Sequence, residues 1–242
     1  MPNESLDGRV IAIAGAAGGL GPAVCRCLTG AGATIACTDV SAERLEGLVG
    51  DLGIERDRCH TQVVDLLDAD AARAWCGSIA EKFGRVDGLM HLVGGWRGGQ
   101  PLHEFDLGDY EFLHDLLVRT VINSTRAFYE QLVASDHGRF VLVSSAQAQN
   151  PDGTNAAYGA TKAAAEAWTL ALADSFRKAE SAATANVLVV NAILTPAMRE
   201  ENPDKEFRTF TSTEDIADAV AFLCSDSAAK MNGKRLPLHP LR

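Results

Sequence analysis

The stretch RVIAIAGAAGGLG, residues 9–21, decides the fold of this 242-residue chain. Residues 9–14 are a short apolar run with β-branched members, which is typical of a strand buried on both faces. A helix is predicted directly after it, over residues 19–31. Gly15, Gly19 and Gly21 lie at this junction, where glycine permits a tight turn and lets backbone amides approach a pyrophosphate at a helix N-terminus. The strand–turn–helix context favours a dinucleotide-binding loop over a turn that only packs helix on strand.

The rest of the chain alternates between predicted strands and helices. Further strands are predicted at residues 34–38, 59–64, 86–93, 139–144, 186–193 and 235–238. Helices are predicted from Ser41 as N-cap, over 68–83, in two segments across 105–135, over about 156–180 and over 213–224. This order predicts an α/β fold with right-handed βαβ units. We expect a Rossmann-like, doubly wound parallel sheet of seven strands, in a single domain over residues 1–242. Small substrate loops are expected at about 94–110 and 194–212.

The composition narrows the classes of partner. The chain has 22 Lys plus Arg against 32 Asp plus Glu, a formal charge of −10. This balance argues against DNA, RNA or an anionic membrane as the main partner. The six cysteines form no C-x-x-C pair and have no histidine at zinc-finger spacing, so we expect reduced packing residues and no metal site. No signal-peptide pattern and no uncharged apolar run of 18 residues is present, which predicts a cytoplasmic protein.

Two carboxylates follow predicted strands. Asp39 lies 24 residues after Gly15, where it can accept hydrogen bonds from adenosine ribose hydroxyls and would repel a 2′-phosphate. Because the next residue is Val40 rather than a basic residue, we expect NAD(H) in preference to NADP(H). The alternative is that Asp39 only caps the following helix. Asp65 closes the third strand and can reach the adenine edge, or it is a solvated charge at a strand end.

Three further residues form a candidate chemical constellation. Tyr158 and Lys162 are four residues apart on a predicted helix and therefore share one face. A free tyrosine, with a pKa near 10, is a weak acid at neutral pH, and an adjacent ammonium stabilises its phenolate. Ser145 ends the fifth strand, 13 residues before Tyr158. Its hydroxyl can hydrogen-bond a substrate oxygen at the sheet edge where α/β proteins bind ligands.

In this order, the glycine loop, Asp39, the strand-end serine and the Tyr-x-x-x-Lys pair resemble the short-chain dehydrogenase/reductase family. The resemblance covers about residues 6–239 and implies a single Rossmann domain, often tetrameric, that passes a hydride between nicotinamide C4 and a substrate carbon. It implies that Ser145 orients the substrate oxygen, that Tyr158 is the acid/base, and that Lys162 lowers the tyrosine pKa and holds the nicotinamide ribose. The cofactor-binding residues it implies are Gly15, Gly19, Leu20, Gly21, Asp39, Asp65, Leu66, Val93, Gly94, Tyr158 and Lys162.

The chain departs from the family pattern at four places. Ala14 stands where a threonine is usual, and residues 91–94 read His-Leu-Val-Gly in place of Asn-Asn-Ala-Gly. Leu117 aligns with the asparagine that normally holds a water between the lysine and solvent. Asn123 is six residues further, about 240° around a helix, and is a poor replacement. The Pro-Gly pair after the sixth strand is missing, and residues 191–196 run on as a shortened loop.

Several other residues have two possible interpretations. Residues 96–99 follow the fourth strand and are expected at the mouth of the site, where Arg97 binds an anionic substrate group or is a solvated loop residue. Gln147 lies two residues after Ser145 and could face the substrate. We interpret His91, His103 and His114 as satisfied packing or solvated residues, because they lack metal-ligand spacing.

Two functions and an oligomer follow from these patterns. The first function is an active NAD(H)-dependent oxidoreductase on a carbonyl/alcohol pair, with a small-molecule substrate. The alternative is an NAD(H)-binding sensor or scaffold with little or no turnover, which Leu117 and the shortened loop motivate. The helix at 156–180 is apolar nearly all round, so it needs cover on more than one side. We expect a homodimer or homotetramer formed through it.

Overall fold

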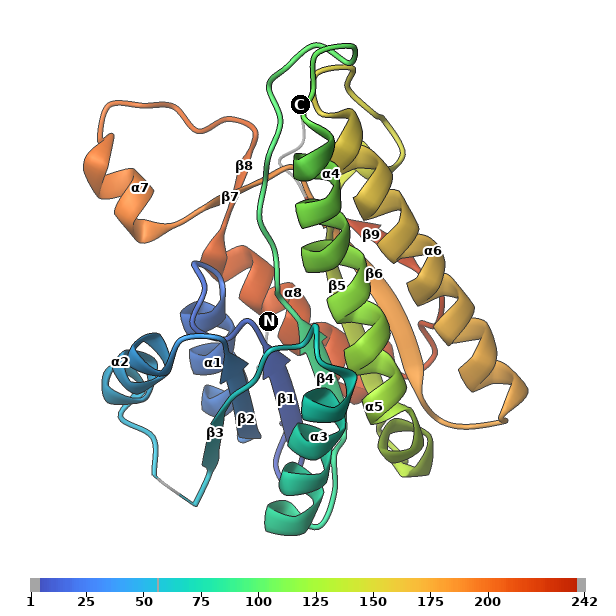
Figure 1. Cartoon of the computed structure of the whole chain (residues 1–242). Helices are drawn as coiled ribbons and strands as arrows, with labels where there is room; N and C mark the ends of the chain where they lie inside the picture. Colours follow the sequence, from blue (N-terminus) through green and yellow to red (C-terminus); the bar gives the residue numbers. More distant parts are fainter. Residues whose placement is uncertain (1–4, 56, 239–242) are drawn as a thin grey trace.

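A computed structural model describes residues 5–55 and 57–238. Its main sheet has seven parallel strands, confirming the expected doubly wound α/β fold (Figure 1). In spatial order these are β3 (Cys59–Val63), β2 (Thr34–Asp39), β1 (Val10–Ala14), β4 (Gly88–His91), β5 (Arg139–Ser145), β6 (Thr184–Val190) and β9 (Arg235–Pro237). The strand order reverses between β1 and β4, and such a switch point leaves a crevice at the carboxyl ends of the strands.

Strand β1 shows why the sheet needs an apolar run. All five of its residues are buried. Ile11 and Ile13 pack into the hydrophobic cluster on one face of the sheet. Val10, Ala12 and Ala14 pack into the cluster on the other face. Because side chains alternate along a strand, both faces must be apolar, and the sequence therefore shows a continuous run.

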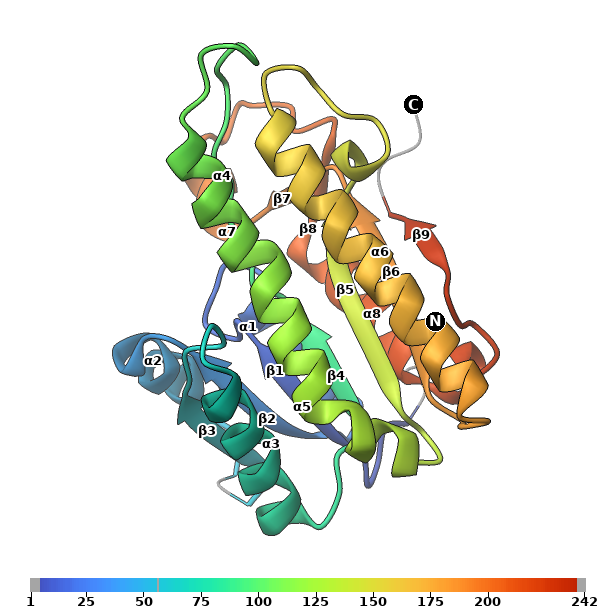
Figure 2. The same cartoon turned by 45° about the vertical axis from the view of Figure 1, so that its right-hand side comes forward.

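Helices cover both faces of the sheet (Figures 1 and 2). One layer contains α1 (Gly21–Gly30), α2 (Ala42–Leu52) and α8 (Thr213–Cys224). The other contains α3 (Ala69–Phe83), α5 (Thr120–Ala134) and α6 (Ala156–Lys178). Ser41 caps α2 as predicted, since its hydroxyl accepts a hydrogen bond from the Arg44 amide at 3.3 Å.

The region 105–135 differs from the expected two helical segments. Helix α4 (Leu107–His114) continues through a π-helical turn (Asp115–Arg119) directly into α5. Residues 109–134 contain neither glycine nor proline, so nothing breaks the helix. The extra residue in the π turn changes which side chains face the sheet, and such turns are frequent at functional sites.

The strand predicted over 186–193 is also different. β6 ends at Val190, and β7 (Ala192–Leu194) leaves the main sheet to pair with β8 (Phe210–Ser212). The side chain of Asn191 donates to the carbonyl oxygen of Thr209 at 3.1 Å and so holds the new direction. Between these strands lies α7 (Pro196–Glu201), in an arm that projects beside the sheet (Figure 1). The other predicted boundaries agree with the structure to within two residues.

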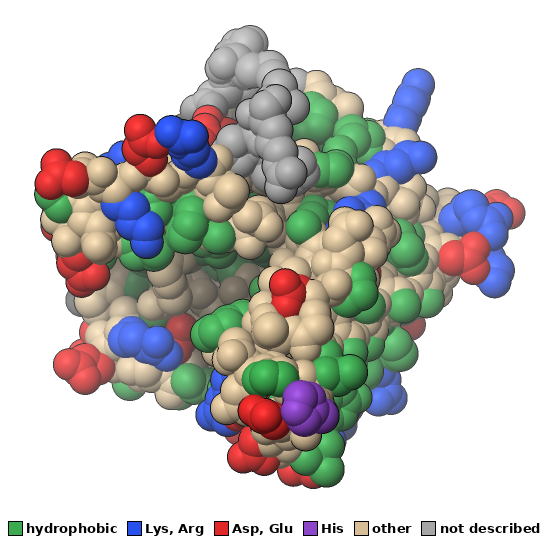
Figure 3. Space-filling view, turned by 90° about the horizontal axis from the view of Figure 1, so that it is seen from above, with side chains coloured by type: hydrophobic (Ala, Val, Ile, Leu, Met, Phe, Trp, Pro, Cys, Tyr) green, Lys and Arg blue, Asp and Glu red, His purple; other side chains and the backbone are tan. Residues whose placement is uncertain are grey.

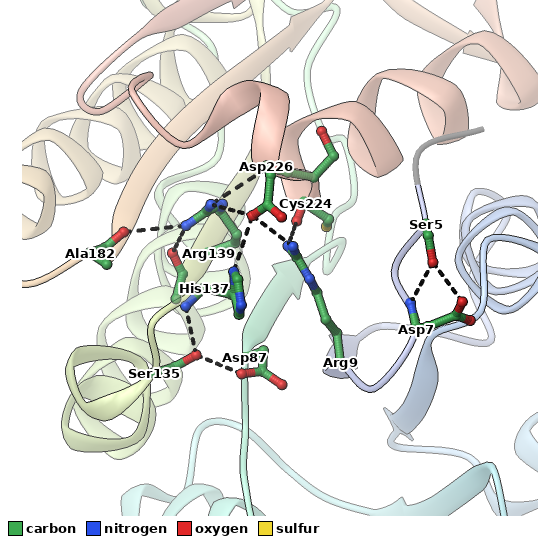
Figure 4. A network of polar contacts seen from close by, with 12 residues as sticks. Ser5, Asp7, Arg9, Asp87, Ser135, His137, Arg139, Ala182, Cys224 and Asp226 are labelled. Atoms are coloured by element: carbon green, nitrogen blue, oxygen red, sulfur yellow. Dashed lines mark hydrogen bonds and ion pairs between the residues drawn. The ribbon is translucent and has the colours of Figure 1, made fainter. Parts of the chain in front are cut away.

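A polar network anchors the amino ends of the strands (Figure 4). Arg9 pairs with Asp226 at 2.7 Å, and its guanidinium also donates to the carbonyl oxygen of Cys224. Asp87 accepts hydrogen bonds from the Val10 amide at 2.9 Å and from the Ser135 hydroxyl at 2.6 Å. These contacts join the amino ends of β1 and β4 to the turn before β5. The carboxyl ends of the same strands are left for a site. No helix within residues 5–55 and 57–238 is long and apolar enough to cross a membrane.

Candidate active site

A cavity of about 760 Å³ opens at the carboxyl ends of the central strands. Figure 3 shows it from above as a hollow with acidic and basic side chains around its rim. Its volume is in the range of about 300–1,000 Å³ typical of small-molecule and cofactor sites. Ten of the predicted site residues line it: Gly15, Gly19, Leu20, Asp39, Asp65, Leu66, Val93, Gly94, Tyr158 and Lys162. Gly21 and Ser145 are not in the lining.

The glycine loop forms a cradle that side chains would fill. Gly15 has a φ of +76°, and a Cβ there would lie 2.9 Å from the Val93 amide nitrogen. A Cβ on Gly21 would lie 1.9 Å from the Ala16 carbonyl oxygen, so Gly21 lets α1 pack against the loop. The first turn of α1 has no side-chain cap and no acidic residue. The Gly21 amide donates to the Gly18 carbonyl oxygen at 3.1 Å and Pro22 has no amide hydrogen, so the remaining amides and the helix dipole are what fit the pyrophosphate of a dinucleotide.

Asp39 is buried at the end of β2 and lines the cavity. Its Oδ1 accepts from the Ser41 amide at 3.2 Å and from the Arg44 guanidinium at 2.5 Å. Asp39 therefore does support the start of α2 through Oδ1. Arg44 also lines the cavity, with half of its side chain exposed. The sequence could have revealed Arg44 only through its place in the first turn after the Ser41 cap.

Asp65 and Leu66 form the next part of the lining. Asp65 is exposed, and its Oδ1 accepts from the Leu67 amide at 2.9 Å, which fixes the turn after β3. The side chain of Asn123 donates to the carbonyl oxygens of Leu66 and Leu67, at 2.9 and 3.0 Å. Asn123 thus holds this loop. It takes no part around Lys162, as its position along the helix predicted.

Tyr158 and Lys162 both line the cavity, and Ser145, which is outside the lining, lies next to the Tyr158 side chain. Lys162 donates from Nζ to the carbonyl oxygen of Val143 at 3.0 Å, and Nζ lies 5.8 Å from the centroid of the Tyr158 ring. Burial raises the pKa of Tyr158, and a side-chain hydrogen bond with Ser145 opposes this. The sequence predicted that Lys162 lowers the tyrosine pKa. In the structure burial sets the net direction of the Tyr158 pKa, and the ammonium of Lys162 donates to the carbonyl oxygen of Val143.

Lys162 is buried although it lines the cavity, and this affects the pKa of its ammonium. Burial lowers the pKa of Lys162 to about 8, and the charge of Glu166 opposes that lowering. His91, in β4, is buried close enough to Lys162 to feel its charge, and its ring nitrogens have no well-formed hydrogen bond. Burial and the Lys162 charge lower the pKa of His91 to about 3, so the ring is neutral. The expectation of a satisfied packing histidine is therefore wrong for His91.

Leu117 lies in the π turn, which directs it away from the cavity. Leu117 is buried and does not line the cavity, whereas Leu116 and Thr120 do. The Thr120 hydroxyl donates to the Leu116 carbonyl oxygen at 2.6 Å. No polar side chain replaces the family asparagine at this position of the π turn.

The shortened loop still borders the cavity. Asn191, Ala192, Ile193 and Thr195 all line it. A Cβ added to Gly19 would lie 3.2 Å from the Thr195 Cγ2, so the loop closes onto the glycine loop. The start of the arm therefore forms part of the cavity wall next to the glycine loop.

The remaining candidate residues differ in whether they line the cavity. Trp96 lines the cavity mouth as expected, and Phe112, which the sequence did not single out, lines it too. Arg97 donates to Asp109 at 2.8 Å, and its guanidinium carbon lies 3.7 Å from the centroid of the Phe112 ring. It is absent from the lining of this cavity. The side-chain oxygen of Gln147 is buried without a partner, two residues from Ser145.

His103 and His114 lie at the surface, each beside an acidic neighbour. In the described part of the chain, no group of three or more histidines, cysteines or carboxylates could hold a metal ion.

A family model described as short chain dehydrogenase matches residues 9–206. The chain belongs to the short-chain dehydrogenase/reductase family. The resemblance inferred from the sequence motifs is confirmed.

Relatives of the family span nearly the whole chain. Oxidoreductase UcpA of Escherichia coli (strain K12) is 29% identical over 245 residues, covering 94% of this chain and 92% of that protein. The 2,3-dihydro-2,3-dihydroxybenzoate dehydrogenase of Bacillus subtilis (strain 168) is 29% identical over 246 residues, covering 94% and 93%. Among solved structures, levodione reductase has a TM-score of 0.85 and 26% identity, covering 96% of both chains.

Proposed function

We propose that the protein is an NAD(H)-dependent oxidoreductase that passes a hydride between the cofactor and a small carbonyl/alcohol substrate. The observation that carries this proposal is that one cavity is lined by both the glycine loop and the Tyr158–Lys162 pair. The named activities of similar dehydrogenases and reductases support the same reaction class.

The proton chemistry falls to Tyr158. A bound nicotinamide cofactor supplies or accepts the hydride. Tyr158 donates its phenolic proton to the substrate oxygen during reduction and takes it back during oxidation, while Ser145 hydrogen-bonds that oxygen. Ser145 is well placed because its Oγ already accepts from the Gln147 amide at 3.3 Å, which fixes its orientation.

Lys162 has two tasks in this proposal. One of its three ammonium protons is used on Val143, so two N–H groups are free to hold the nicotinamide ribose. Below its pKa of about 8 the ammonium is charged and favours the phenolate form of Tyr158. Turnover that needs this charge should therefore decline as the pH rises through about 8.

Asp39 supports the choice of NAD(H) over NADP(H). Its Oδ1 is held by Arg44 and Ser41, which leaves Oδ2 to accept from the ribose hydroxyls. A 2′-phosphate would meet the buried carboxylate there. Asp65 and Leu66 are proposed to contact the adenine end.

The substrate side is proposed to come from the loops at about 94–110 and 194–212. The cavity wall near these loops contains Trp96, Phe112 and Ile193 and is mostly apolar. Gln147 has a buried acceptor without a partner two residues from Ser145, so it suits a substrate hydroxyl or amide. We therefore propose a compact, largely apolar carbonyl/alcohol substrate.

The alternative is a cofactor-binding protein without turnover, which the apolar Leu117 favours. NADH fluorescence measures binding, and NADH oxidation over a panel of carbonyl compounds measures turnover. Our proposal expects both, with turnover lost in Tyr158→Phe and binding retained. Binding without turnover for any compound supports the alternative.

A homodimer or homotetramer through α6 is part of the proposal. Trp168 is partly exposed and lines a hollow of about 410 Å³ between α5 and α6, and Leu170 is exposed at another side of α6. Exposed apolar patches of this kind mark interfaces. Light scattering should show a mass that is a multiple of 25.7 kDa. A monomer at micromolar concentration contradicts this part.

A cytoplasmic location is also proposed. The free thiols of Cys25 and Cys37 lie 3.7 Å apart and share a hydrogen bond, as expected in a reducing compartment.

A further inference from the structure

A third polar residue lies on the same face of α6 as Tyr158 and Lys162. Glu166 follows Lys162 by four residues, one helical turn further from the cavity. It is only 5% exposed. Burying a carboxylate costs free energy unless the group is paired and hydrogen-bonded.

Both oxygens of Glu166 are occupied. Oε1 accepts from the Ser144 hydroxyl at 2.6 Å, and Oε2 accepts from Nε of Arg235 at 2.8 Å. Arg235 comes from β9, at the far edge of the main sheet, and about a fifth of its side chain is exposed. The carboxylate therefore joins α6, β5 and β9 beneath the proposed active site.

The network holds three consecutive residues at the end of β5. Lys162 binds the carbonyl oxygen of Val143, Glu166 binds the hydroxyl of Ser144, and the Arg235 guanidinium donates to the carbonyl oxygen of Ser145 at 3.4 Å. Ser145 is the residue that faces the Tyr158 phenol. The strand end that presents Ser145 is thus fixed by the same side chains that surround Lys162.

The charges around Lys162 are few. Tyr158 and Glu166 face it from α6, neutral His91 faces it from β4, and Arg235 lies behind Glu166 on β9. Asp115, in the π turn, lines the same cavity but is paired with Arg119 at 3.2 Å. Glu166 is therefore the buried anion that opposes the effect of burial on Lys162.

We propose that Glu166 is a positioning residue of this site: its carboxylate keeps the buried Lys162 ammonium charged and, with Arg235, fixes the strand end that carries Ser145. The inference rests on the proposed function, in which the charge of Lys162 favours the phenolate of Tyr158. It assigns to Glu166 an electrostatic role rather than a purely structural one.

The direct test is the titration of Lys162 in the free protein. The chain has six lysines, so NMR of protein labelled with ¹³C at lysine Cε gives few signals, and Lys162→Arg identifies the relevant one. Glu166→Gln removes the charge but keeps groups able to bond Ser144. We expect it to lower the titration midpoint of Lys162 by about one pH unit or more, which is the shift that an opposite charge close by produces.

A second variant separates the effect of the Glu166 charge from the effect of its ion pair with Arg235. Arg235→Met breaks the same ion pair but leaves the carboxylate, so it should not lower the Lys162 midpoint. The double variant Glu166→Leu/Arg235→Met replaces the pair with apolar side chains and should lower it, which covers the case in which Glu166→Gln fails to fold. Glu81→Gln, an exposed change on α3, is the matched control and should leave the midpoint in place.

An unchanged midpoint in the folded variants that lack the carboxylate overturns the proposal, and so does a lower midpoint in Arg235→Met. The titration needs no substrate, so it is independent of whether turnover is found. Where turnover is found, the high-pH limb of kcat/KM should move to lower pH in Glu166→Gln by the same amount as the Lys162 midpoint. A limb that stays in place shows that Glu166 does not act through Lys162.

Discussion

Replacing Gly21 with alanine perturbs the tightest contact of the glycine loop. The new Cβ would lie 1.9 Å from the carbonyl oxygen of Ala16, 2.4 Å from its carbonyl carbon and 2.8 Å from its Cα. Because real Cβ contacts begin near 3.0 Å and all three atoms are backbone, the loop and α1 must separate by about 1 Å. Overpacking of this kind costs about 1–3 kcal/mol. For a chain of this length, that lowers Tm by about 2–12 °C.

The same shift disturbs the anion cradle. Because a displacement of about 1 Å can cost up to about a hundredfold in function, NADH binding should weaken by about ten- to a hundredfold. Thermal denaturation followed by circular dichroism gives Tm, and NADH fluorescence titration gives Kd.

Gly50→Ala is the matched control. Gly50 lies in α2 with no atom within 4 Å of an added Cβ, so alanine should raise stability by about 0.5–1 kcal/mol and leave NADH binding unchanged. If Gly21→Ala melts at the wild-type temperature and binds NADH as tightly, the account of the glycine loop is wrong.

Three further outcomes follow from individual contacts. Asp39→Ala should relax the preference for NAD(H), and an unchanged NAD/NADP ratio of kcat/KM refutes the role of Asp39. Burial raises the pKa of Asp87, but hydrogen bonds from Arg85 and Ser135 outweigh it, so the net pKa is lowered. Its stabilisation is thus present above the unfolded pKa near 4 and lost as the pH falls below it. Asp87→Asn should cost about 1–3 kcal/mol at neutral pH and flatten that acid-dependent loss, as measured by urea denaturation. Trp168→Arg should reduce the mass measured by light scattering without lowering the NADH affinity of the folded protein, and an unchanged mass argues against an α6 interface.

Much of the fold could be predicted because the deciding signals are local. The run at 9–14 reads as a doubly buried strand, and its two faces do pack into separate clusters. Helix α8 was predicted at its observed bounds, and in the structure the Ser212 hydroxyl caps it by accepting from the Asp215 amide. The glycine loop was recognisable because its context fixes where the backbone must approach a ligand.

The parts that could not be predicted depend on distant contacts. β7 and β8 have three residues each, too short for a periodic signal, and they pair across the arm. The π turn has no composition of its own, so Leu116 and Thr120 rather than Leu117 face the cavity. Glu166 has no local pattern that marks it. Its partners, Ser144 and Arg235, lie 22 and 69 residues away in sequence.

The measurement that tests the central claim most directly compares the wild-type protein with Tyr158→Phe in NADH oxidation over a carbonyl panel, with NADH affinity measured for both. We predict turnover of at least one compound by the wild type, a loss of about 10²–10⁴-fold in kcat/KM for the variant, and equal NADH affinity. Turnover that is equal in the two proteins, or its absence with every compound despite tight NADH binding, contradicts the assignment of Tyr158 as the acid/base of an active oxidoreductase.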